Sequence, residues 1–580
     1  LLYDRGRFRG LVMAVIDEVA DPAVFSVRLE MGRVSGQLGF VHQVPDDVRA
    51  TSIQLSPRLF FQVTPCASPE QATDHFRRVM AALYPPPPIP DWVKYQWGTW
   101  YAFGMDYDED TIRTQIDYIA EKLADLGPWS VLLDAGWYVA EGRPGSGWEV
   151  DLEKFPSGLR ALVDYAHSKD IKVVLYFSAP YLDDREREGN WLGLRGFIEQ
   201  HPDWVIPLQS DSTGASYVYD FTNPELVEYM RKLISDFFLV YDVDGIKIDG
   251  LGQAEGELLS VEERDSFGDV NKIRMFTTEI YRLVYEEATR AKKDVYIESG
   301  WAIPGFANRL AHTFRYGDEF PDFEARYPHG GLVEHVDYAS VQKRIVGQRP
   351  NMGMVWGGPV SQRTIRLWFE AALAMGSQMT ISTDLSRMSS RDLSALRSVL
   401  VHYNAFQGET YFMGMPFPES FATTSNGITY LGGLNRDREA KEMVFNLSDY
   451  GLDWEREYLV YDVSSNSFSR VRGSFPATLD GSSFRLFLLR DTPGVVWTNS
   501  SHQTESAPGS LTVRVMGPSS ITGFAQIYLP TSPSRVSLDG RELARSPRPI
   551  AGSSYWYDEA TGVLRLRYRH DRPHTIEVEY

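Results

Sequence analysis

The chain has 580 residues, of which 43% are hydrophobic and 23% are charged, as in globular proteins large enough for several domains. Its formal net charge of −20 argues against a nucleic-acid binder and against a partner of anionic membranes, because both need a basic face. The single cysteine, Cys66, excludes an intrachain disulfide framework and a cysteine-based zinc site.

The first 84 residues predict a β-rich domain. Short runs such as "AVFSVRLEMG" and "PRLFFQVTP" are separated by turn residues, and a helical stretch follows them. "PPPPIP" at 85–90 is a stiff linker that indicates a domain border. The first residues lack an initiator Met and a signal-peptide pattern, so we expect the chain to begin inside a domain. The sequence does not decide whether the protein is cytoplasmic or secreted. No apolar run has the length of a membrane span.

From 93 to 405, apolar runs alternate with amphipathic helical segments. "SVLLDAGW" leads to "SGLRALVDYAHSKD", and "DGIKIDG" leads to a long helical stretch, with eight such units in all. This count and length predict a catalytic (β/α)8 TIM barrel. A doubly wound sheet is the alternative, but its nucleotide-binding version would need a Gly-rich loop after the first strand, which is missing.

After 405 the helical patterns stop. Runs such as "GITYLGGLNRD" and "SFRLFLLRD" predict a β-sandwich over 406–500. A second small β-domain is expected over 508–580, with "SSHQTESAPGS" as the linker before it. We expect these domains to brace the barrel or to contribute homo-oligomer contacts.

Charged residues stand where several predicted barrel strands end, which is the active-site face of this fold. Carboxylates that point into one pocket repel each other and lose hydration. Selection for stability alone would therefore not place several of them there. Taken singly, each could instead cap the next helix, most plainly Asp134 or Asp384. The set comprises Asp134, Lys247, Asp249, Glu298, Asp318 and Asp384.

Two chemistries fit this set, a divalent metal with oxygen ligands or the hydrolysis of a glycoside by two carboxyl groups. None of the 11 histidines forms HxH or HExxH, so histidine decides little. Tryptophans near strand ends favour a sugar, although core packing explains each one alone equally well. They are Trp97, Trp100, Trp137, Trp301 and Trp356. A metal-dependent lyase or isomerase would lose activity with a chelator.

Several motifs in the barrel region align in order with one enzyme family. "LLDAGWY", "GWEVDLEKFPSGLRALVDYAHSKDIKVVLYF", "HPDWVI" with "YDFTNPELVEYM", and "DGIKIDG" resemble motifs of family 36 α-galactosidases (melibiases), in the clan with families 27 and 31. The resemblance implies that Asp249 is the nucleophile and that Lys247 binds sugar hydroxyls and helps to keep Asp249 ionised. It places the acid/base at Asp318 in "TFRYGDEF", with Arg315 as a substrate or carboxylate contact or a structural ion pair. Glu319 and Asp322 are competitors for the acid/base.

Three departures from the family pattern affect the substrate more than the reaction. The paired "DD" of the family is Asp134-Ala135 here, which leaves Asp134 as the single anchor for sugar hydroxyls. "ESGWA" replaces a glycine-rich stretch and adds Glu298 as a hydroxyl-binding candidate. "YFSAPYL" lacks a glutamate that the family carries there.

The sequence therefore predicts a retaining α-glycosidase of the α-galactosidase type. The predicted catalytic pair is Asp249 and Asp318, and the predicted substrate is an oligosaccharide or glycoside. No cofactor or metal is implied. A transglycosylase of the raffinose-synthase type and a non-catalytic carbohydrate-binding barrel are the alternatives. The expected substrate-binding residues are Asp134, Lys247, Trp97, Trp137, Glu298, Trp301 and Arg315.

Overall fold

The computed structural model describes most of the chain from residue 69 onward, together with five earlier strands. The described ranges are 2–4, 9–15, 23–30, 33–40, 59–65, 69–139, 147–178, 181–183, 195–212, 214–250, 267–300, 305–315, isolated positions between 332 and 343, 349–355, 362–414 and 417–580.

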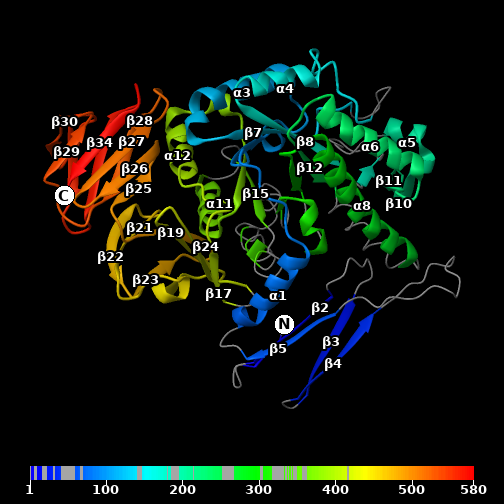
Figure 1. The fold of residues 1–580 in the computed structure, drawn as a ribbon, viewed down its shortest axis with the longest axis horizontal. Helices are drawn as coiled ribbons and strands as arrows, with labels where there is room; N and C mark the ends of the chain where they lie inside the picture. The colour runs from blue at the N-terminus through cyan, green and yellow to red at the C-terminus, as the bar shows by residue number, and fades with distance from the viewer. Residues whose placement is uncertain are drawn as a thin grey trace.

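Eight parallel strands form a closed barrel in the middle of the molecule (Figure 1). Their order around the ring follows the chain, and the ring closes where Thr380 pairs with Gln96 and Ile381 with Trp97. The predicted (β/α)8 barrel is thus confirmed. The strands are β6 (Tyr95–Gly98), β7 (Trp129–Leu133), β8 (Ile171–Ser178), β12 (Gly245–Asp249), β13 (Tyr296–Ser299), β14 (Thr313–Arg315), β15 (Pro350–Val355) and β16 (Gln378–Ser382).

Amphipathic helices surround the ring, and their ends follow local sequence signals. Asp108 accepts the amide of Thr111 at the start of one helix, and Asn223 accepts that of Glu225 just before a helix that opens with Pro224. Ser389 caps a third in the same way. The helices are α2 (Trp100–Phe103), α3 (Glu109–Lys122), α4 (Leu159–His167), α5 (Arg195–Gln200), α6 (Pro224–Leu239), α8 (Phe267–Ala291), α11 (Gln362–Met375) and α12 (Ser390–Leu400).

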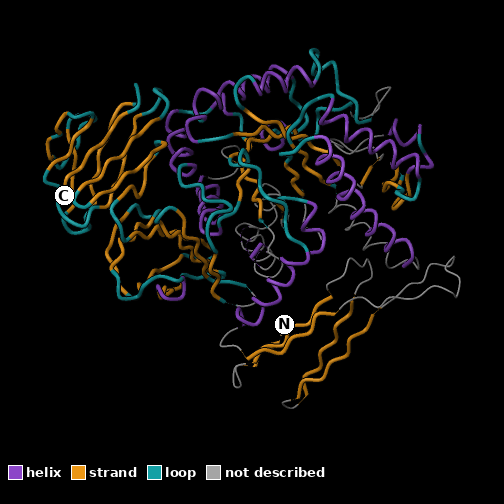
Figure 2. Tube along the Cα trace, viewed as in Figure 1, coloured by secondary structure: helices purple, strands orange, loops and turns teal. Residues whose placement is uncertain are grey.

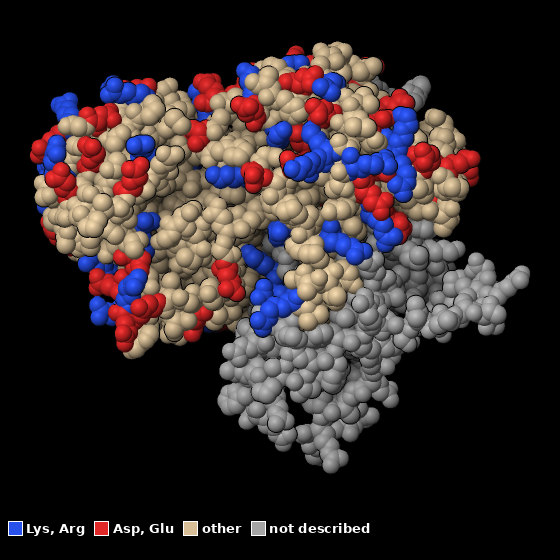
Figure 3. All heavy atoms as spheres, viewed as in Figure 1, with Lys and Arg blue, Asp and Glu red and all other residues tan. Residues whose placement is uncertain are grey.

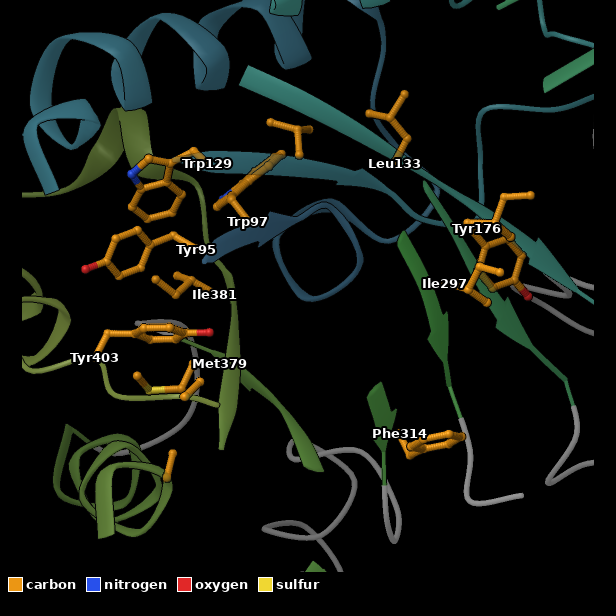
Figure 4. Packing of buried hydrophobic residues seen from close by; sticks show 14 of the residues in the cluster. Tyr95, Trp97, Trp129, Leu133, Tyr176, Ile297, Phe314, Met379, Ile381 and Tyr403 are labelled. Atoms are coloured by element: carbon orange, nitrogen blue, oxygen red, sulfur yellow. The ribbon is translucent and has the colours of Figure 1, made fainter. Parts of the chain in front are cut away.

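Large aromatic side chains fill the space between the barrel and its helices (Figure 4). Tyr95 and Trp129, from neighbouring strands, stack with ring centroids 5.0 Å apart, and Tyr403 packs on Tyr95 at the same distance. The Tyr95 hydroxyl donates to the carbonyl of Leu400 at 2.8 Å. This contact ties the first strand of the ring to its last helix.

The fifth crossover differs from the expected strand–helix unit. The eight predicted units require an α-helix here, but the segment "IPGFANRLA" contains a short 3₁₀ helix, Gly305–Leu310. The 3₁₀ helix has six residues, which make about two turns of this tighter helix. The sixth expected helix, "YASVQKRIVG", lies mostly outside the described residues. The third crossover carries a small antiparallel sheet of β9 (Tyr181–Asp183), β10 (Val205–Asp211) and β11 (Gly214–Tyr219).

The N-terminal strands form two antiparallel groups at the bottom of Figure 1, followed by α1 (Pro69–Leu83). One group joins β1 (Leu2–Asp4), β2 (Arg9–Val15) and β5 (Leu59–Pro65), and the other pairs β3 (Ala23–Glu30) with β4 (Arg33–Phe40). None of the helices described has the length and hydropathy needed to cross a membrane.

The region after α12 consists of mostly antiparallel sheets, seen as orange strands beside the barrel in Figure 2. An eight-stranded sheet joins β17 (Thr410–Met413), β18 (Ser420–Ser425), β19 (Ile428–Asn435), β24 (Ser483–Arg490), β21 (Glu457–Asp462), β22 (Ser467–Arg472), β23 (Ser474–Leu479) and β20 (Lys441–Asn446). Residues of α11 pack against its strands β18, β19 and β24.

Two five-stranded sheets complete the chain, with a core of their own. The first joins β25 (Gly494–Thr498), β28 (Thr522–Tyr528), β33 (Val563–Arg569), β32 (Ser554–Asp558) and β31 (Ala544–Arg545). The second joins β26 (Ser501–Ala507), β27 (Ser510–Met516), β34 (His574–Glu579), β29 (Arg535–Leu538) and β30 (Arg541–Glu542).

The expected linker at "SSHQTESAPGS" is wrong, because most of it is strand β26, which pairs with β27 along its whole length. Its polar composition reflects an exposed sheet surface with a hairpin turn. We propose that the last domain begins between β24 and β25.

Candidate active site

Strand β12 carries a lysine and an aspartate two residues apart on the inner face of the barrel. Lys247 is 4% exposed and Asp249 is 5% exposed, while Ile248 between them faces the hydrophobic core. The Lys247 ammonium lies 2.8 Å from Asp134 Oδ2 and 3.4 Å from Asp249 Oδ2. One buried cation therefore bridges two buried carboxylates from strands β7 and β12.

The Asp249 carboxylate has further partners at the end of its strand. Its Oδ1 accepts the amide of Gly250 at 2.9 Å and lies 3.6 Å from Arg315 Nη2 on β14. Gly300, directly after β13, leaves room for it, since a Cβ at that position would come within 2.7 Å of Asp249 Cγ. Two cations and a backbone amide thus hold the Asp249 carboxylate in a fixed position.

Asp134 is fixed by its own backbone and that of its neighbours. Its amide donates to Thr99 Oγ1 at 3.0 Å, and its Oδ1 accepts the amide of Ala135 at 2.9 Å. The hydroxyl of Tyr107 donates to the Asp134 carbonyl. Ala135 is fully buried in the hydrophobic core, so its methyl group takes no part in a polar site.

Glu298 lies beside Lys247 in the register of β13 and β12 and is 4% exposed. Gln96 Nε2 donates to its Oε2 at 3.1 Å, and Gln96 in turn accepts the Thr380 hydroxyl. Burial raises the pKa of Glu298, although Lys247, Gln96 and Arg315 oppose the change.

A small cavity of about 30 Å³ lies among these groups. It brings together four of the predicted substrate-binding residues, Asp134, Lys247, Glu298 and Arg315, from four different strands. Six lining residues were not among the predicted site residues. They are Gly98, Trp100, Tyr101, Leu132, Thr380 and Ser382.

Other predicted site residues do not line this cavity. Trp97 and Trp137 are fully buried, and their indole N–H groups donate to the carbonyls of Thr383 and Tyr176. The structure therefore places both in the core, whereas Trp100 lines the cavity. Asp318 and Trp301 lie outside the described residues.

Asp384, the remaining strand-end carboxylate, has the helix-capping role that was its alternative. It accepts the Ser386 amide at 3.1 Å and the Gln115 amide nitrogen at 2.9 Å, and it pairs with Arg387. Within the described part of the chain, no group of three or more His, Cys, Asp and Glu residues is arranged to hold a metal ion.

Polar residues on β6 and β16 were missed because they sit inside apolar strands. Gln96 and Thr380 face each other across the closing pair of strands. Ser382 accepts the amide of Tyr101 and donates to the carbonyl of Gly98, which fixes the start of α2 beside the cavity. Of these polar residues only Ser382 ends its strand, and that position was the available signal.

Residues 96–306 match the sequence model of the Melibiase family. The chain is 21% identical over 378 residues to alpha-galactosidase 1 of Pediococcus pentosaceus, a match that covers 60% of this chain and 46% of that protein. It thus spans less than half the length of this curated relative. The family match lies within the barrel region.

Solved structures share the fold at low sequence identity. A family 27 β-L-arabinopyranosidase from Geobacillus stearothermophilus, in complex with arabinose, superposes with a TM-score of 0.52 at 16% identity, covering 71% of this chain and 99% of that one. The α-galactosidase of Lactobacillus brevis superposes with a TM-score of 0.55 at 17% identity. This match covers 84% of this chain and 67% of that one. Both similarities support the barrel with its C-terminal β-structure.

Proposed function

We propose that this chain is a retaining α-glycosidase that removes terminal α-linked sugars through a covalent glycosyl-enzyme intermediate. The observation that carries the proposal is the Lys247 ammonium between Asp134 and Asp249 at the end of the barrel strands. An ionised, immobilised Asp249 is suited to attack an anomeric carbon, and Asp134 and Lys247 are suited to bind sugar hydroxyls. Among the related families, the quoted motifs favour family 36.

In the proposed mechanism, Asp249 forms a bond to the anomeric carbon while the bond to the leaving oxygen breaks. Asp318 protonates that oxygen, then takes a proton from the water molecule that releases the sugar from Asp249. The two carboxyl groups of a retaining pair lie about 5–5.5 Å apart. Glu298 lies in the same cavity and is suited to bind a sugar hydroxyl.

The sugar in the pocket is proposed to be close to galactose in shape. Ala135 offers no second carboxylate beside Asp134, so the pocket binds the sugar with fewer anionic contacts than a paired aspartate would give. A screen of nitrophenyl α-galactoside, α-glucoside, α-N-acetylgalactosaminide and β-L-arabinopyranoside identifies the preferred sugar. Product analysis at high acceptor concentration separates hydrolysis from transglycosylation.

The nucleophile is tested with Asp249→Ala on the best nitrophenyl substrate. Loss of a nucleophile typically costs about 10⁴-fold or more in kcat, and the variant should keep its thermal stability within a few degrees. Azide added to the variant should occupy the vacated space, bond to the anomeric carbon and expel nitrophenolate, giving a glycosyl azide of inverted configuration. Undiminished hydrolysis by Asp249→Ala would refute the assignment.

The acid/base assignment needs a different readout. Asp318→Ala should lower the rate strongly for substrates with poor leaving groups and much less for nitrophenyl glycosides, because nitrophenolate leaves without a proton. The same comparison on Asp322→Ala and Glu319→Gln serves as control. If one of these reproduces the leaving-group dependence and Asp318→Ala does not, that residue takes the role.

A further inference from the structure

A second, much larger hollow lies outside the barrel, where three parts of the chain meet. It has a volume of about 1770 Å³ and is lined by helices α11 and α12, by the eight-stranded sheet and by the sheet that contains β25 and β28. Figure 3 shows the surface hollowed between the C-terminal strands, at the left, and the barrel. We refer to it as the junction cleft.

The wall formed by the last domain is a sheet face with an unusual row of side chains. Trp497 on β25 pairs with Gln526 on β28, Gln526 with Arg565 on β33, and Arg565 with Trp556 on β32. All four line the junction cleft. Residues at the alternate positions of the same strands, such as Ile527 and Leu564, form the core on the other face. The row is therefore the outer face of an otherwise ordinary sheet.

This row combines flat rings with hydrogen-bonding groups. Trp497 and Trp556 are partly exposed, and Phe524 lies beside them, opposite Arg567 in the neighbouring row. The Arg565 guanidinium lies 4.7 Å from the Trp556 ring, which supports the ring from one side. Aromatic rings at intervals, with amide and guanidinium groups between them, match the alternating apolar faces and hydroxyls of a sugar chain.

Two buried polar atoms in the row lack a partner within the described chain. Gln526 is 9% exposed, and its Oε1 has no hydrogen-bond donor among the described residues. Arg565 Nε likewise has no described acceptor. Buried polar groups are normally paired, so an unpaired acceptor next to an unpaired donor suits a ligand that carries both hydroxyls and anionic oxygens.

The charge of the junction cleft is opposite to that of the whole chain. Six arginines and three acidic residues line it, although the chain carries a net charge of −20. Arg366 pairs with Glu370, and Arg485 with Asp462. In the part of the chain that is described, the other four arginines make no ion pair. These are Arg391, Arg548, Arg565 and Arg567.

We propose that the junction cleft is a binding site for an anionic oligosaccharide, one that carries carboxylate or sulfate groups. The unpaired arginines would bind the anionic groups, the rings of the row would stack on the sugar faces, and Gln526 would accept a hydroxyl. The net charge of −20 over the whole chain disfavours a longer polyanion such as a nucleic acid. The site is separate from the barrel cavity and does not depend on the function proposed for it.

Isothermal titration of the full chain tests the site with five probes, which are four compounds and a single-stranded DNA. A hexagalacturonate and a sulfated galactan oligosaccharide represent the two sources of negative charge, with a neutral galactan oligosaccharide and inorganic sulfate as comparisons. We expect at least one of the anionic oligosaccharides to bind, with affinity that falls as salt rises. No binding of either, equal binding of the neutral oligosaccharide, or equally tight binding of sulfate alone would overturn the proposal. So would equal binding of a single-stranded DNA of similar length.

Variants connect the binding to the cleft. Arg567→Gln, at an exposed position, and Arg565→Gln should each lower the affinity about tenfold, because each removes a charged hydrogen bond. Trp556→Ala should lower it as well. Arg541→Gln, an exposed arginine on β30 of the other C-terminal sheet, is the matched control and should bind like the wild type. Hydrolysis of a nitrophenyl glycoside should be unchanged in Arg567→Gln. Unchanged affinity in both arginine variants would show that the ligand binds elsewhere.

Discussion

At the scale of single residues, the position of the Asp249 carboxylate depends on the absence of a side chain at residue 300. Asp249 is held by Lys247, Arg315 and the Gly250 amide, so it cannot move away from a new atom without losing one of these partners. A methyl group at Gly300 would overlap it. Displacing a reacting group by about 1 Å can cost roughly 100-fold in rate.

We therefore expect Gly300→Ala to lower kcat/KM by about 100-fold on the best nitrophenyl substrate, with little change in KM. Ser299→Ala is the control, because the Ser299 hydroxyl contacts Tyr281 on α8. That variant should keep activity near the wild-type level. A crystal structure of Gly300→Ala with Asp249 unmoved, together with normal activity, would contradict the prediction.

Much of the residue set around the cavity could be read from strand ends alone. Asp134, Lys247, Glu298 and Arg315 stand at or near the last residue of a predicted strand, where a barrel gathers side chains. Gln96 and Thr380 could not be recognised, since their pairing depends on the register between the first and last strands. The burial of Trp97 and Trp137 depends on neighbouring layers, which no local pattern specifies.

At the scale of elements, strand β12 is held at its N-terminal end by a second cluster of charged residues. Asp244, just before the strand, is 1% exposed. It lies 2.7 Å from His167 Nε2 on α4 and 2.9 Å from Lys292 Nζ after α8, and it accepts the Val173 amide of β8. Burial alone would raise the pKa of Asp244, but these hydrogen bonds hold the pKa well below its usual range. The strand that carries the site is thus tied to two helices and its neighbour.

We expect Asp244→Asn to lower the free energy of unfolding at pH 7 by about 3 kcal/mol, because it leaves buried donors without a charged acceptor. A carboxyl group with a lowered folded pKa stabilises above its unfolded value, about 3.9, and that stability is lost as pH falls. The difference between variant and wild type should therefore shrink below about pH 4. Urea unfolding across this range measures it.

Asp242→Asn is the matched control for that cluster, since its partly exposed carboxylate also contacts Lys292. A small, nearly pH-independent effect is expected there. Equal losses in the free energy of unfolding in the two variants would show that the buried hydrogen bonds of Asp244 add no extra stability.

Most elements followed from periodicity and capping residues, as at Asp108 and Asn223. The fifth crossover did not, because a short apolar segment between two strands fits a 3₁₀ turn as well as an α-helix. The strand β26 was missed because it is polar along its length, and only its pairing with β27 makes it a strand.

At the scale of the whole molecule, one buried arginine joins the barrel to the last domain. Arg397 on α12 is fully buried and contacts both carboxylate oxygens of Asp125, at 2.7 and 2.6 Å. It also donates to the carbonyls of Lys122 and of Asn499, which lies between β25 and β26. The Ser501 hydroxyl contacts the same Asp125. This network fixes the last domain against the barrel and thereby one wall of the junction cleft.

Replacing Arg397 by Met should cost about 3–5 kcal/mol, because Asp125 and two carbonyls lose their partner. Calorimetry of the variant should show a separate, earlier transition for the last domain. The exposed Arg391→Met on the same helix should melt like the wild type. A single transition at the wild-type temperature in Arg397→Met would show that apolar packing alone joins the two parts.

The way the ring closes also affects how the protein is made. The pairing of Thr380 with Gln96 spans 284 residues, so β6 has one unpaired edge until almost the whole barrel has been synthesised. At roughly 5–20 residues per second, that interval lasts about 15 to 60 s. During this time a nascent apolar strand edge is exposed on the ribosome, where it can pair with the wrong neighbour. Yield in a heterologous host should therefore depend on chaperones that cover strand edges more than on the final stability of the enzyme.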